Sequence, residues 1–511
     1  MLFNSFSFLF IYLPITAFGF FLLARVRQNY AAYWLAAASL FFYGCWDYRY
    51  IPLLLGSIAL NFWAGRRITR ATARRGGWLA FAITADLALL AYFKYADFFI
   101  YSINAAANTE IEVLGIVLPI GISFFTFTQI AFLVDCYQGK ARAYNFAHYL
   151  LFVTYFPHLI AGPVLHHSEM MPQFADPKNY TARSENFAIG LTIFSIGLAK
   201  KVLIADNLAP HASFVFEQST DPSMIIAWGG VLAYTFQVYF DFSGYSDMAI
   251  GLSRLFGVRL PLNFDSPYKA HSISDFWRRW HMTLSRFLRD YLYFPLGGNR
   301  RGPTRRCVNL LITMLLGGLW HGAGWSFVIW GGLHGVYLIV NHAWVAAVRR
   351  LNLKPKGRVW RGTAWLLTFL AVCFAWVYFR APHLDAAHGI LAGMLGFNGV
   401  GLPAAIGSAL GPLRGLLEAI GMDFYLGGGM RFVQTWSLTV SAAFIAFCMP
   451  NTQQLLTRFE PAINYSDARK AESVRALLWR PTRSWAAWIG LLASLSLLSL
   501  NHPSEFLYFQ F

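Results

Sequence analysis

Apolar stretches of about the length of a bilayer span recur along the whole chain. A helix of about 20 apolar residues crosses the hydrocarbon core of a membrane, and here such runs alternate with short polar or basic segments. The pattern predicts spans near residues 6–24, 31–46, 49–65, 78–102, 112–135, 146–165, 186–204, 223–257, 307–320, 325–346, 363–379, 431–449 and 485–500. The chain is therefore expected to be an all-α, polytopic membrane protein.

These spans are expected to form a single integral membrane domain over residues 1–511. It is divided into N-terminal helices (6–257), a core (258–346) and C-terminal helices (347–511). The sequence has no internal repeat and no inverted hydropathy symmetry, which argues against a secondary transporter because many transporter folds are built on such repeats. The Gly-rich, weakly charged stretch 381–430 is expected outside the cytoplasm.

Composition and charge agree with this class. Of the 511 residues 57% are hydrophobic and 13% are charged, against roughly 25% charged residues in soluble proteins. The net charge of +17 comes from basic clusters between the apolar runs, as the positive-inside rule expects, and we do not expect nucleic acid as a partner. The Arg66–Arg75 cluster and the loop 458–483 are expected in the cytoplasm. The scattered cysteines form no CxxC pair, so neither a disulfide framework nor a thiolate metal site is indicated.

The stretch 271–290 is amphipathic and basic, and it is too charged to cross a bilayer. It is expected to form an interfacial helix, on which Asp275, Arg279 and Arg286 lie near one another. With the segment that follows, it supplies a cytoplasmic cationic rim of Arg278, Arg279, Arg286, Arg289, Arg300, Arg301, Arg305 and Arg306. This rim can attract anionic lipid headgroups, or it can bind a phosphorylated donor such as coenzyme A, because arginine binds phosphate well.

His321 lies in a short break between two apolar runs. The run Cys307–Trp320 has 14 residues and rises about 21 Å, less than the roughly 30 Å of the hydrocarbon core. The turn His321–Gly324 is therefore expected at membrane depth, where irregular backbone is tolerated only inside protein or beside a water-filled cavity. A neutral histidine there can act as a general base toward a hydroxyl. The alternative is a structural histidine that hydrogen-bonds to a neighbouring helix.

Other polar positions inside apolar runs are weaker candidates. His158 lies among helix-breaking prolines and glycines, and the segment 236–247 (FQVYFDFSGYSD) is expected to be interrupted. His334 is expected to be a structural residue, with lining the cavity of His321 as the alternative. No metal site is expected, since HExxH is absent and no set of histidines and carboxylates has convincing spacing. The sequence also has no GxSxG nucleophile elbow and no Walker or GxGxxG phosphate loop.

Several stretches together resemble a known family. They are MLFNSFSFLFIYLPI, LPIGISFFTFTQIAFLVDCY, YFPHLIAGPVLHHSEMMPQF, FQVYFDFSGYSDMAIGLSRLFG, LPLNFDSPYKAHSISDFWRRWHMTLSRFLRDYLYFPLGGNR, LWHGAGWSFVIWGGLHG and FLYFQF. In this order, over nearly the whole chain, the sequence resembles the membrane-bound O-acyltransferase family, and most closely its bacterial alginate O-acetylase branch. Similar proteins acetylate bacterial cellulose or peptidoglycan or transfer D-alanine to teichoic acids, so the stretches specify the family better than the polymer.

The resemblance implies a fold, a site and partners. The fold would be a ring of tilted helices around a tunnel in the bacterial inner membrane, with an acyl thioester entering from the cytoplasm and the acceptor from the other side. The essential histidine maps onto His321. A second important histidine maps onto His281, where many eukaryotic members have asparagine. No tightly bound cofactor is implied: acetyl-CoA is the donor substrate, and the acetyl group passes to periplasmic acetyltransferase partner proteins.

The leading interpretation is therefore acetyl transfer across the inner membrane for O-acetylation of an exopolysaccharide, first of all alginate. His321 is expected to activate the acceptor as a base or to carry the acyl group transiently, and His281 to orient or polarise the thioester. The candidate phosphate ligands for coenzyme A are Arg278, Arg279, Arg286 and Arg289. Two other classes stay open: an exporter of polysaccharide or lipid, which needs a continuous polar path, and a non-catalytic scaffold, which tolerates the loss of His321.

Overall fold

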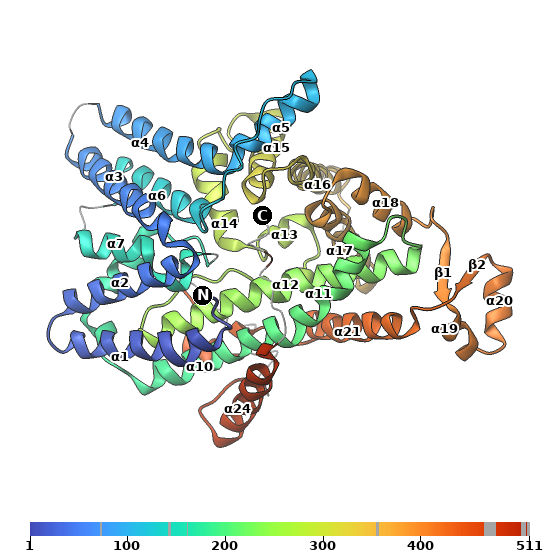
Figure 1. Cartoon of the computed structure of the whole chain (residues 1–511). Helices are drawn as coiled ribbons and strands as arrows, with labels where there is room; N and C mark the ends of the chain where they lie inside the picture. Colours follow the sequence, from blue (N-terminus) through green and yellow to red (C-terminus); the bar gives the residue numbers. More distant parts are fainter. Residues whose placement is uncertain are drawn as a thin grey trace.

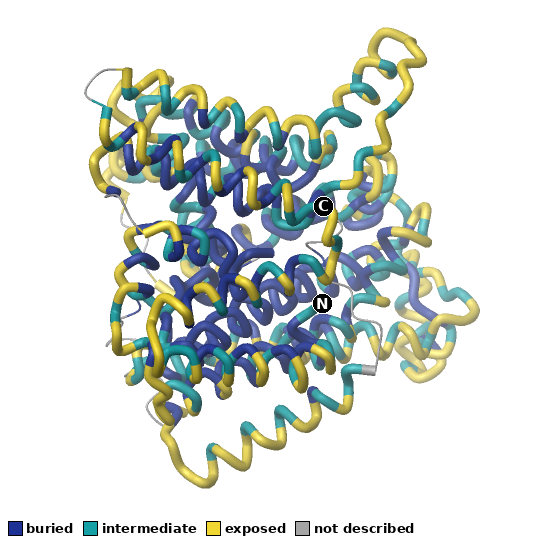
Figure 2. The backbone as a smooth tube through the Cα atoms, turned by 60° about the vertical axis from the view of Figure 1, so that its left-hand side comes forward, coloured by how far each residue is buried: buried dark blue, intermediate teal, exposed yellow. Residues whose placement is uncertain are grey.

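The protein is mostly helical, which confirms the predicted class (Figure 1). The computed structural model describes residues 1–71, 74–141, 145–160, 162–353, 357–463, 465, 477–501 and 507. Three continuous helical stretches are long and apolar enough to cross a membrane, at Arg75–Ala107, Ser184–Gln218 and Arg358–Arg380. Large hydrophobic side chains such as Phe18, Val340 and Trp488 are exposed on the outside, as Figure 2 shows for the outer faces of the helices. Such a surface is expected where lipid is the surrounding solvent.

The N-terminal helices follow the predicted spans with two differences. Their bounds are η1 Phe8–Tyr12, α1 Leu13–Ala24, α2 Gln28–Asp47, η2 Tyr48–Tyr50, α3 Ile51–Arg70, α4 Arg75–Leu90, η3 Ala91–Tyr95, α5 Ala96–Ala107, α6 Ile122–Tyr137, α7 Phe146–Thr154, α8 Phe156–Leu159, α9 His167–Ala175 and η4 Pro177–Tyr180. The predicted span 112–135 is shorter, because α6 begins only at Ile122. The predicted span 146–165 is broken, because Pro157 has no N–H to donate and stands in the first turn of a new helix.

The long central helix α12 is continuous where the sequence predicted a break. The following elements are α10 Ser184–Ala199, η5 Lys200–Ala205, α11 Asp206–Ser213, η6 Phe214–Gln218 and α12 Met224–Leu255. The segment 236–247 was expected to be interrupted, but α12 runs through it without a break. Its glycines serve close packing instead: a Cβ on Gly244 would lie 2.7 Å from the carbonyl oxygen of Gly197 in α10, and one on Gly251 would lie 2.6 Å from that of Gly190. Small residues at these positions let the two helix backbones approach closely.

The basic segment 271–290 is not one interfacial helix. It forms α13 (Ile273–Trp277) and α14 (Met282–Leu288), followed by η8 (Arg289–Tyr293) and preceded by η7 (Pro267–Lys269). Backbone hydrogen bonds hold the turn between α13 and α14 against the strand-like segment before it: the Asp265 N–H donates to the Arg279 carbonyl, and the Met282 N–H donates to the Asn263 carbonyl, both at 2.9 Å. These distant partners replace the helical hydrogen bonds, so the single-helix prediction was wrong.

The break after His321 is confirmed, but the helix before it is longer than predicted. α15 spans Gly302–His321, 20 residues, because Gly302 and Pro303 begin the helix and its first turns include the basic cluster. At 1.5 Å per residue it is about 30 Å long, not 21 Å. α16 spans Trp325–Arg350, and the two helices pack closely, because a Cβ on Gly331 would collide with the Met314 carbonyl oxygen.

The C-terminal part contains the described strands. Its elements are α17 Arg358–Arg380, α18 Leu384–Met394, β1 Val400–Pro403, α19 Ala404–Ala409, α20 Leu413–Ala419, β2 Met422–Tyr425, α21 Gly429–Cys448, α22 Thr452–Leu455, η9 Thr457–Phe459, α24 Arg483–Leu498 and η11 Ser499–Asn501. β1 and β2 pair in parallel within the stretch 381–430 and project from one side of the molecule (Figure 1). Of the terminal FLYFQF only Leu507 is among the described residues; it is buried, and its N–H donates to Asp241 Oδ2 at 3.3 Å.

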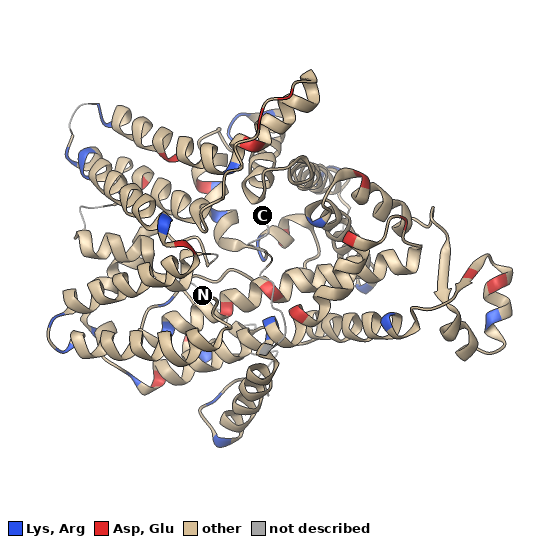
Figure 3. Ribbon diagram, viewed as in Figure 1, with Lys and Arg blue, Asp and Glu red and all other residues tan. Residues whose placement is uncertain are grey.

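Basic residues gather at helix ends on one side of the molecule. Figure 3 shows them at the α1–α2 and α3–α4 connections, on the left of that view. This is the side that the arginine pattern assigns to the cytoplasm. The orientation and the division of the single domain into three parts stay predictions.

Candidate active site

His321 is the last residue of α15 and lies inside the protein. Only 6% of it is exposed. Its ring is surrounded by aromatic rings, with centroid distances of 5.0 Å to Trp320, 5.0 Å to Trp330 and 5.2 Å to Phe379. The helix break and this aromatic packing fix the imidazole at the end of α15, where the expected site was placed.

The second predicted histidine lies beside the first. The ring centroids of His281 and His321 are 6.3 Å apart, although the two residues belong to different segments. His281 is fully buried between α13 and α14, and its φ of +41° lies in the left-handed region. Histidine and asparagine are enriched several-fold at such positions, whereas β-branched residues are outliers there.

Asn263 orients the His281 ring. Its Oδ1 lies 3.1 Å from His281 Nδ1 and also accepts hydrogen bonds from the Thr283 hydroxyl, at 2.9 Å, and the Thr283 N–H, at 3.3 Å. Three converging contacts of this kind identify the atom as an acceptor, so His281 Nδ1 carries the proton. Nε2 of a neutral His281 is then an acceptor that can take up a proton.

The left-handed backbone conformation at His281 limits which side chains this position tolerates. His281→Asn is expected to fold like the parent protein and to keep part of the acetyl transfer, because asparagine tolerates the left-handed region. His281→Val is expected to lose roughly 1–3 kcal/mol of stability from backbone strain. Melting temperatures of the two purified variants test this; equal melting temperatures would show that the turn relaxes without cost.

A small cavity reaches His321 from one side. Its volume is about 90 Å³, room for several water molecules or a group of acetyl size. The lining residues come from the end of α2, η3, the α5–α6 connection, the start of α6, the residue after α8 and the end of α15: Trp46, Lys94, Leu118, Pro119, Ile120, Gly121, Ile122, Ser123, Phe124, Ile160, Trp320 and His321. In the predicted topology this is the side that faces away from the cytoplasm. His281 is not among the lining residues, although its ring lies 6.3 Å from that of His321.

Lys94 belongs to this site and was missed in the sequence. Its Nζ donates to the Trp320 carbonyl at 2.6 Å and to the His321 carbonyl at 3.1 Å. It stands in η3, a π-helical turn between α4 and α5, and such turns are frequent at functional sites. A cation at a helix C-terminus pairs with the unsatisfied carbonyls and the negative end of the helix dipole. The signal in the sequence was a lone lysine within the apolar run 78–102.

His334 has a packing position. The Trp277 indole N–H donates to its Nδ1 at 3.2 Å, and its ring contacts Trp330 at 4.9 Å. It is fully buried and is not among the residues that line the cavity at His321. Trp330 contacts both rings, so His334 supports the aromatic wall at His321. This agrees with the structural role expected from the sequence, and the alternative of lining the cavity is not supported.

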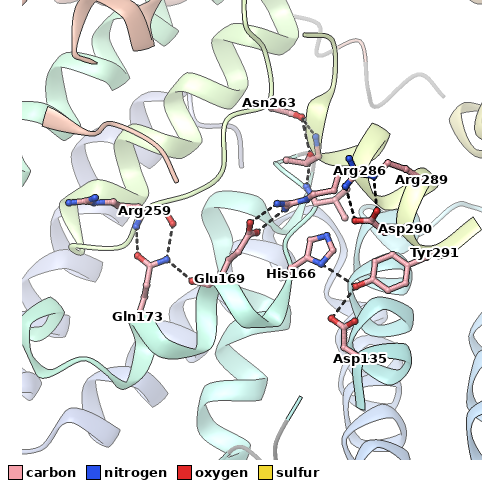
Figure 4. A network of polar contacts seen from close by, with 12 residues as sticks. Asp135, His166, Glu169, Gln173, Arg259, Asn263, Arg286, Arg289, Asp290 and Tyr291 are labelled. Atoms are coloured by element: carbon pink, nitrogen blue, oxygen red, sulfur yellow. Dashed lines mark hydrogen bonds and ion pairs between the residues drawn. The ribbon is translucent and has the colours of Figure 1, made fainter. Parts of the chain in front are cut away.

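Most of the arginines proposed for donor phosphates are paired with carboxylates. Arg279 contacts Asp275 at 3.0 Å, and Arg289 contacts Asp290 at 2.7 Å. Arg286 does not join Arg279 as predicted: it makes a two-armed ion pair with Glu169 of α9, at 2.5 Å and 2.8 Å (Figure 4). Arg278 is exposed and has no carboxylate partner among the described residues.

A polar network surrounds the Arg286 ion pair on the side that is predicted to be cytoplasmic. The Tyr291 hydroxyl donates to Asp135 at 3.0 Å and lies 3.1 Å from His166 Nδ1, while His167 contacts Asp135 at 3.1 Å (Figure 4 shows the first two). Despite these histidines and carboxylates, no group of three or more His, Cys, Asp or Glu residues within the described part of the chain could hold a metal ion. The network ties α6, α9 and η8 together beneath the site.

Comparisons with known proteins decide the family. The chain is 44% identical over 485 residues to a peptidoglycan O-acetyltransferase of Helicobacter pylori, which covers 89% of this chain and 90% of that protein. The chain belongs to the membrane-bound O-acyltransferase family. The model of that family matches residues 133–381, which include His281 and His321. This membership confirms the resemblance, the membrane fold and the acyltransferase class.

Other relatives carry different polymer names. A probable alginate O-acetylase of Azotobacter vinelandii is 44% identical over 406 residues, 78% of this chain and 79% of the relative. A teichoic acid D-alanyltransferase of Streptococcus thermophilus is 26% identical over 250 residues, 46% of this chain and 60% of the relative. Acyl transfer is common to all three names, whereas the acceptor polymer differs.

Proposed function

We propose that this membrane acyltransferase passes an acetyl group from acetyl-CoA, bound on the cytoplasmic side of a bacterial inner membrane, to an acceptor on the other side. The observation that supports this most is the pair of histidine rings 6.3 Å apart, of which His321 lines the small cavity. Membership of an acyltransferase family favours an enzyme over an exporter.

The proposed reaction needs one base at the cavity. His321 removes the proton from the acceptor hydroxyl, the hydroxyl oxygen attacks the thioester carbonyl carbon, and the C–S bond breaks. The proton held by His321 returns to the leaving thiolate, so the products are an acetyl ester and coenzyme A. His281 Nε2, an acceptor in the tautomer that Asn263 selects, is proposed to relay this proton or to hold the donor in line.

We propose that the acetyl group passes from this protein to periplasmic acetyltransferase partner proteins, and that these partners O-acetylate a polysaccharide. Alginate and peptidoglycan are both candidates, because relatives named for each polymer are equally identical to this chain. The peptidoglycan O-acetyltransferase matches 89% of the chain and the alginate relative 78%. Deleting the gene and measuring ester-linked acetate on both polymers separates them: the polymer that loses acetate is the acceptor, and unchanged acetate on every envelope polysaccharide contradicts the function.

Within the proposed donor site, Arg278 and Arg286 are expected to behave differently. Arg278→Ala is expected to weaken coenzyme A binding by about 1.5–3 kcal/mol, as for a lost charged hydrogen bond. Arg286→Ala is expected mainly to destabilise the protein, since it leaves Glu169, whose side chain is 13% exposed, without its partner. Calorimetric affinity and melting temperature, measured on both variants, test this contrast. Parental affinity in Arg278→Ala would assign that arginine to lipid contact or topology.

A further inference from the structure

A second, larger cavity opens on the side of the molecule that is predicted to be cytoplasmic. Its volume is about 910 Å³, and its walls come from α9, the connection to α10, the C-terminal end of α12 and the segment after α22. The described lining residues used below are Glu169, Gln173, Arg183, Arg254, Arg259 and Glu460. It shares no lining residue with the cavity at His321.

Arg254 is a buried arginine in the wall of this cavity. It stands near the end of α12, only 6% of it is exposed, and its Nε has no hydrogen-bond partner. The positive charges of Arg183 and Arg259 act on it from the same cavity. A buried charge without a hydrogen-bonded counter-ion is costly and is rarely retained unless something pairs with it.

The nearby carboxylates are mostly engaged elsewhere. Glu169 holds Arg286, and Glu460 holds Arg259. Among the described residues, no ion pair joins a carboxylate to Arg254, although Glu185 and Glu460, which line the same cavity, lie close enough to act on it electrostatically. The charge of Arg254 is therefore left for a ligand.

The wall beside Arg254 is held rigidly. Gln173 donates through Nε2 to the Arg259 carbonyl at 3.0 Å and to the Glu169 carbonyl at 2.8 Å, and its Oε1 accepts from the Arg259 N–H at 2.8 Å (Figure 4). These bonds connect α9 to the segment after α12. A site whose side chains are already fixed loses little conformational freedom when a ligand binds.

We propose that this cavity binds a phosphate ester from the cytoplasmic side, with Arg254 as the anchor and Arg183 as an exposed second contact. The planar guanidinium fork matches phosphate oxygens. A volume of about 910 Å³ is in the range of sites for drug-sized ligands and far exceeds the space that inorganic phosphate needs. The ligand is therefore a phosphate group on a larger molecule: either the nucleotide end of a soluble coenzyme or the headgroup of an anionic phospholipid.

Calorimetric titration of the purified full chain in an uncharged detergent and a phosphate-free buffer tests this. The probes are coenzyme A, for the soluble source, and dihexanoyl-phosphatidylglycerol, for the lipid source. Arg254→Gln is expected to weaken one probe about tenfold or more, and Arg183→Gln to weaken the same probe by a smaller factor. The matched control is Arg70→Gln, an exposed arginine at the end of α3, which is expected to bind as the parent does.

Stability separates a ligand site from a structural arginine. Without ligand, Arg254→Gln is expected to melt at the parental temperature or above it, because a buried charge without a partner has been removed. A lower melting temperature, or parental affinity for both probes in Arg254→Gln and Arg183→Gln, overturns the proposal, as does a parent protein that binds neither probe. If Arg254→Gln does not fold, the affinity of Arg183→Gln for the two probes alone tests the proposal. Coenzyme A affinity that falls in Arg278→Ala but not in these variants excludes the coenzyme as the ligand of this cavity and leaves the proposed donor intact. If the affinity for the lipid probe is also parental in both variants, the site is overturned.

Discussion

His321→Ala is expected to abolish detectable acetylation of the polymer in cells while the protein still accumulates in the membrane. The imidazole ends α15 on the small cavity, and under the proposed mechanism it takes the proton of the acceptor hydroxyl. A general base contributes typically 10²–10⁴-fold to the rate, so its removal is expected to leave less than about one hundredth of the activity. The measurement is ester-linked acetate per unit of polymer.

His321→Gln distinguishes catalysis from packing at this position. Glutamine can keep a hydrogen bond but cannot take up a proton at neutral pH, so it is expected to fail as the alanine variant does. A structural histidine gives another pattern, in which glutamine partly restores activity and alanine lowers the melting temperature together with activity. His334→Gln is the matched control, since His334 is equally buried behind Trp330 but does not line the cavity; it is expected to affect stability more than transfer.

Lys94→Met is expected to give the second-largest loss, at least tenfold in acetyl transfer. Nζ of Lys94 satisfies the carbonyls of both Trp320 and His321, and hydrogen bonds from a charged donor are worth about 1.5–3 kcal/mol each. Methionine fills similar space but leaves both carbonyls without their donor. The last turn of α15 then shifts, and a displacement of about 1 Å at a reacting group can cost 10²-fold in rate.

A positioning role for Lys94 predicts a particular kinetic pattern. The maximal rate is expected to fall while coenzyme A affinity stays parental, because Lys94 lies on the cavity at His321 and not among the arginines proposed to hold the donor. Lys94→Arg keeps the charge and is expected to recover part of the rate. A Lys94→Met protein with parental rate would show that the two carbonyl hydrogen bonds are dispensable for placing His321.

The sequence predicted most of the helical architecture because lipid-facing helices need long apolar runs. It failed where residues far apart in the chain replace local hydrogen bonds or packing. α12 passes through 236–247 because its glycines fit against α10, and α13 and α14 separate because Asn263 and Asp265 bind the turn between them. The helix before His321 is longer than predicted because α15 includes its basic first turns.

The site was predictable in part. The break at His321 followed from the run lengths, and the importance of His281 followed from the family resemblance, but no spacing in the sequence predicts two rings 6.3 Å apart. Lys94 and Glu169 reach the site region from other helices, so their partners, the carbonyls at the end of α15 and Arg286, are visible only in three dimensions. Of the three proposed donor arginines that have carboxylate partners, Arg279 and Arg289 pair with neighbours in the sequence, and only Arg286 pairs with a distant residue.

Everted membrane vesicles provide the most direct test of acetyl transfer through His321. Their outer face is the cytoplasmic one, so radiolabelled acetyl-CoA added outside meets the proposed donor side while the acceptor pathway is enclosed. Vesicles from cells with the parent protein are expected to accumulate enclosed, ester-linked label, and vesicles with equal amounts of folded His321→Ala protein are expected to accumulate less than about one hundredth of it. Equal label in the two preparations would contradict the assignment of His321 as the catalytic base.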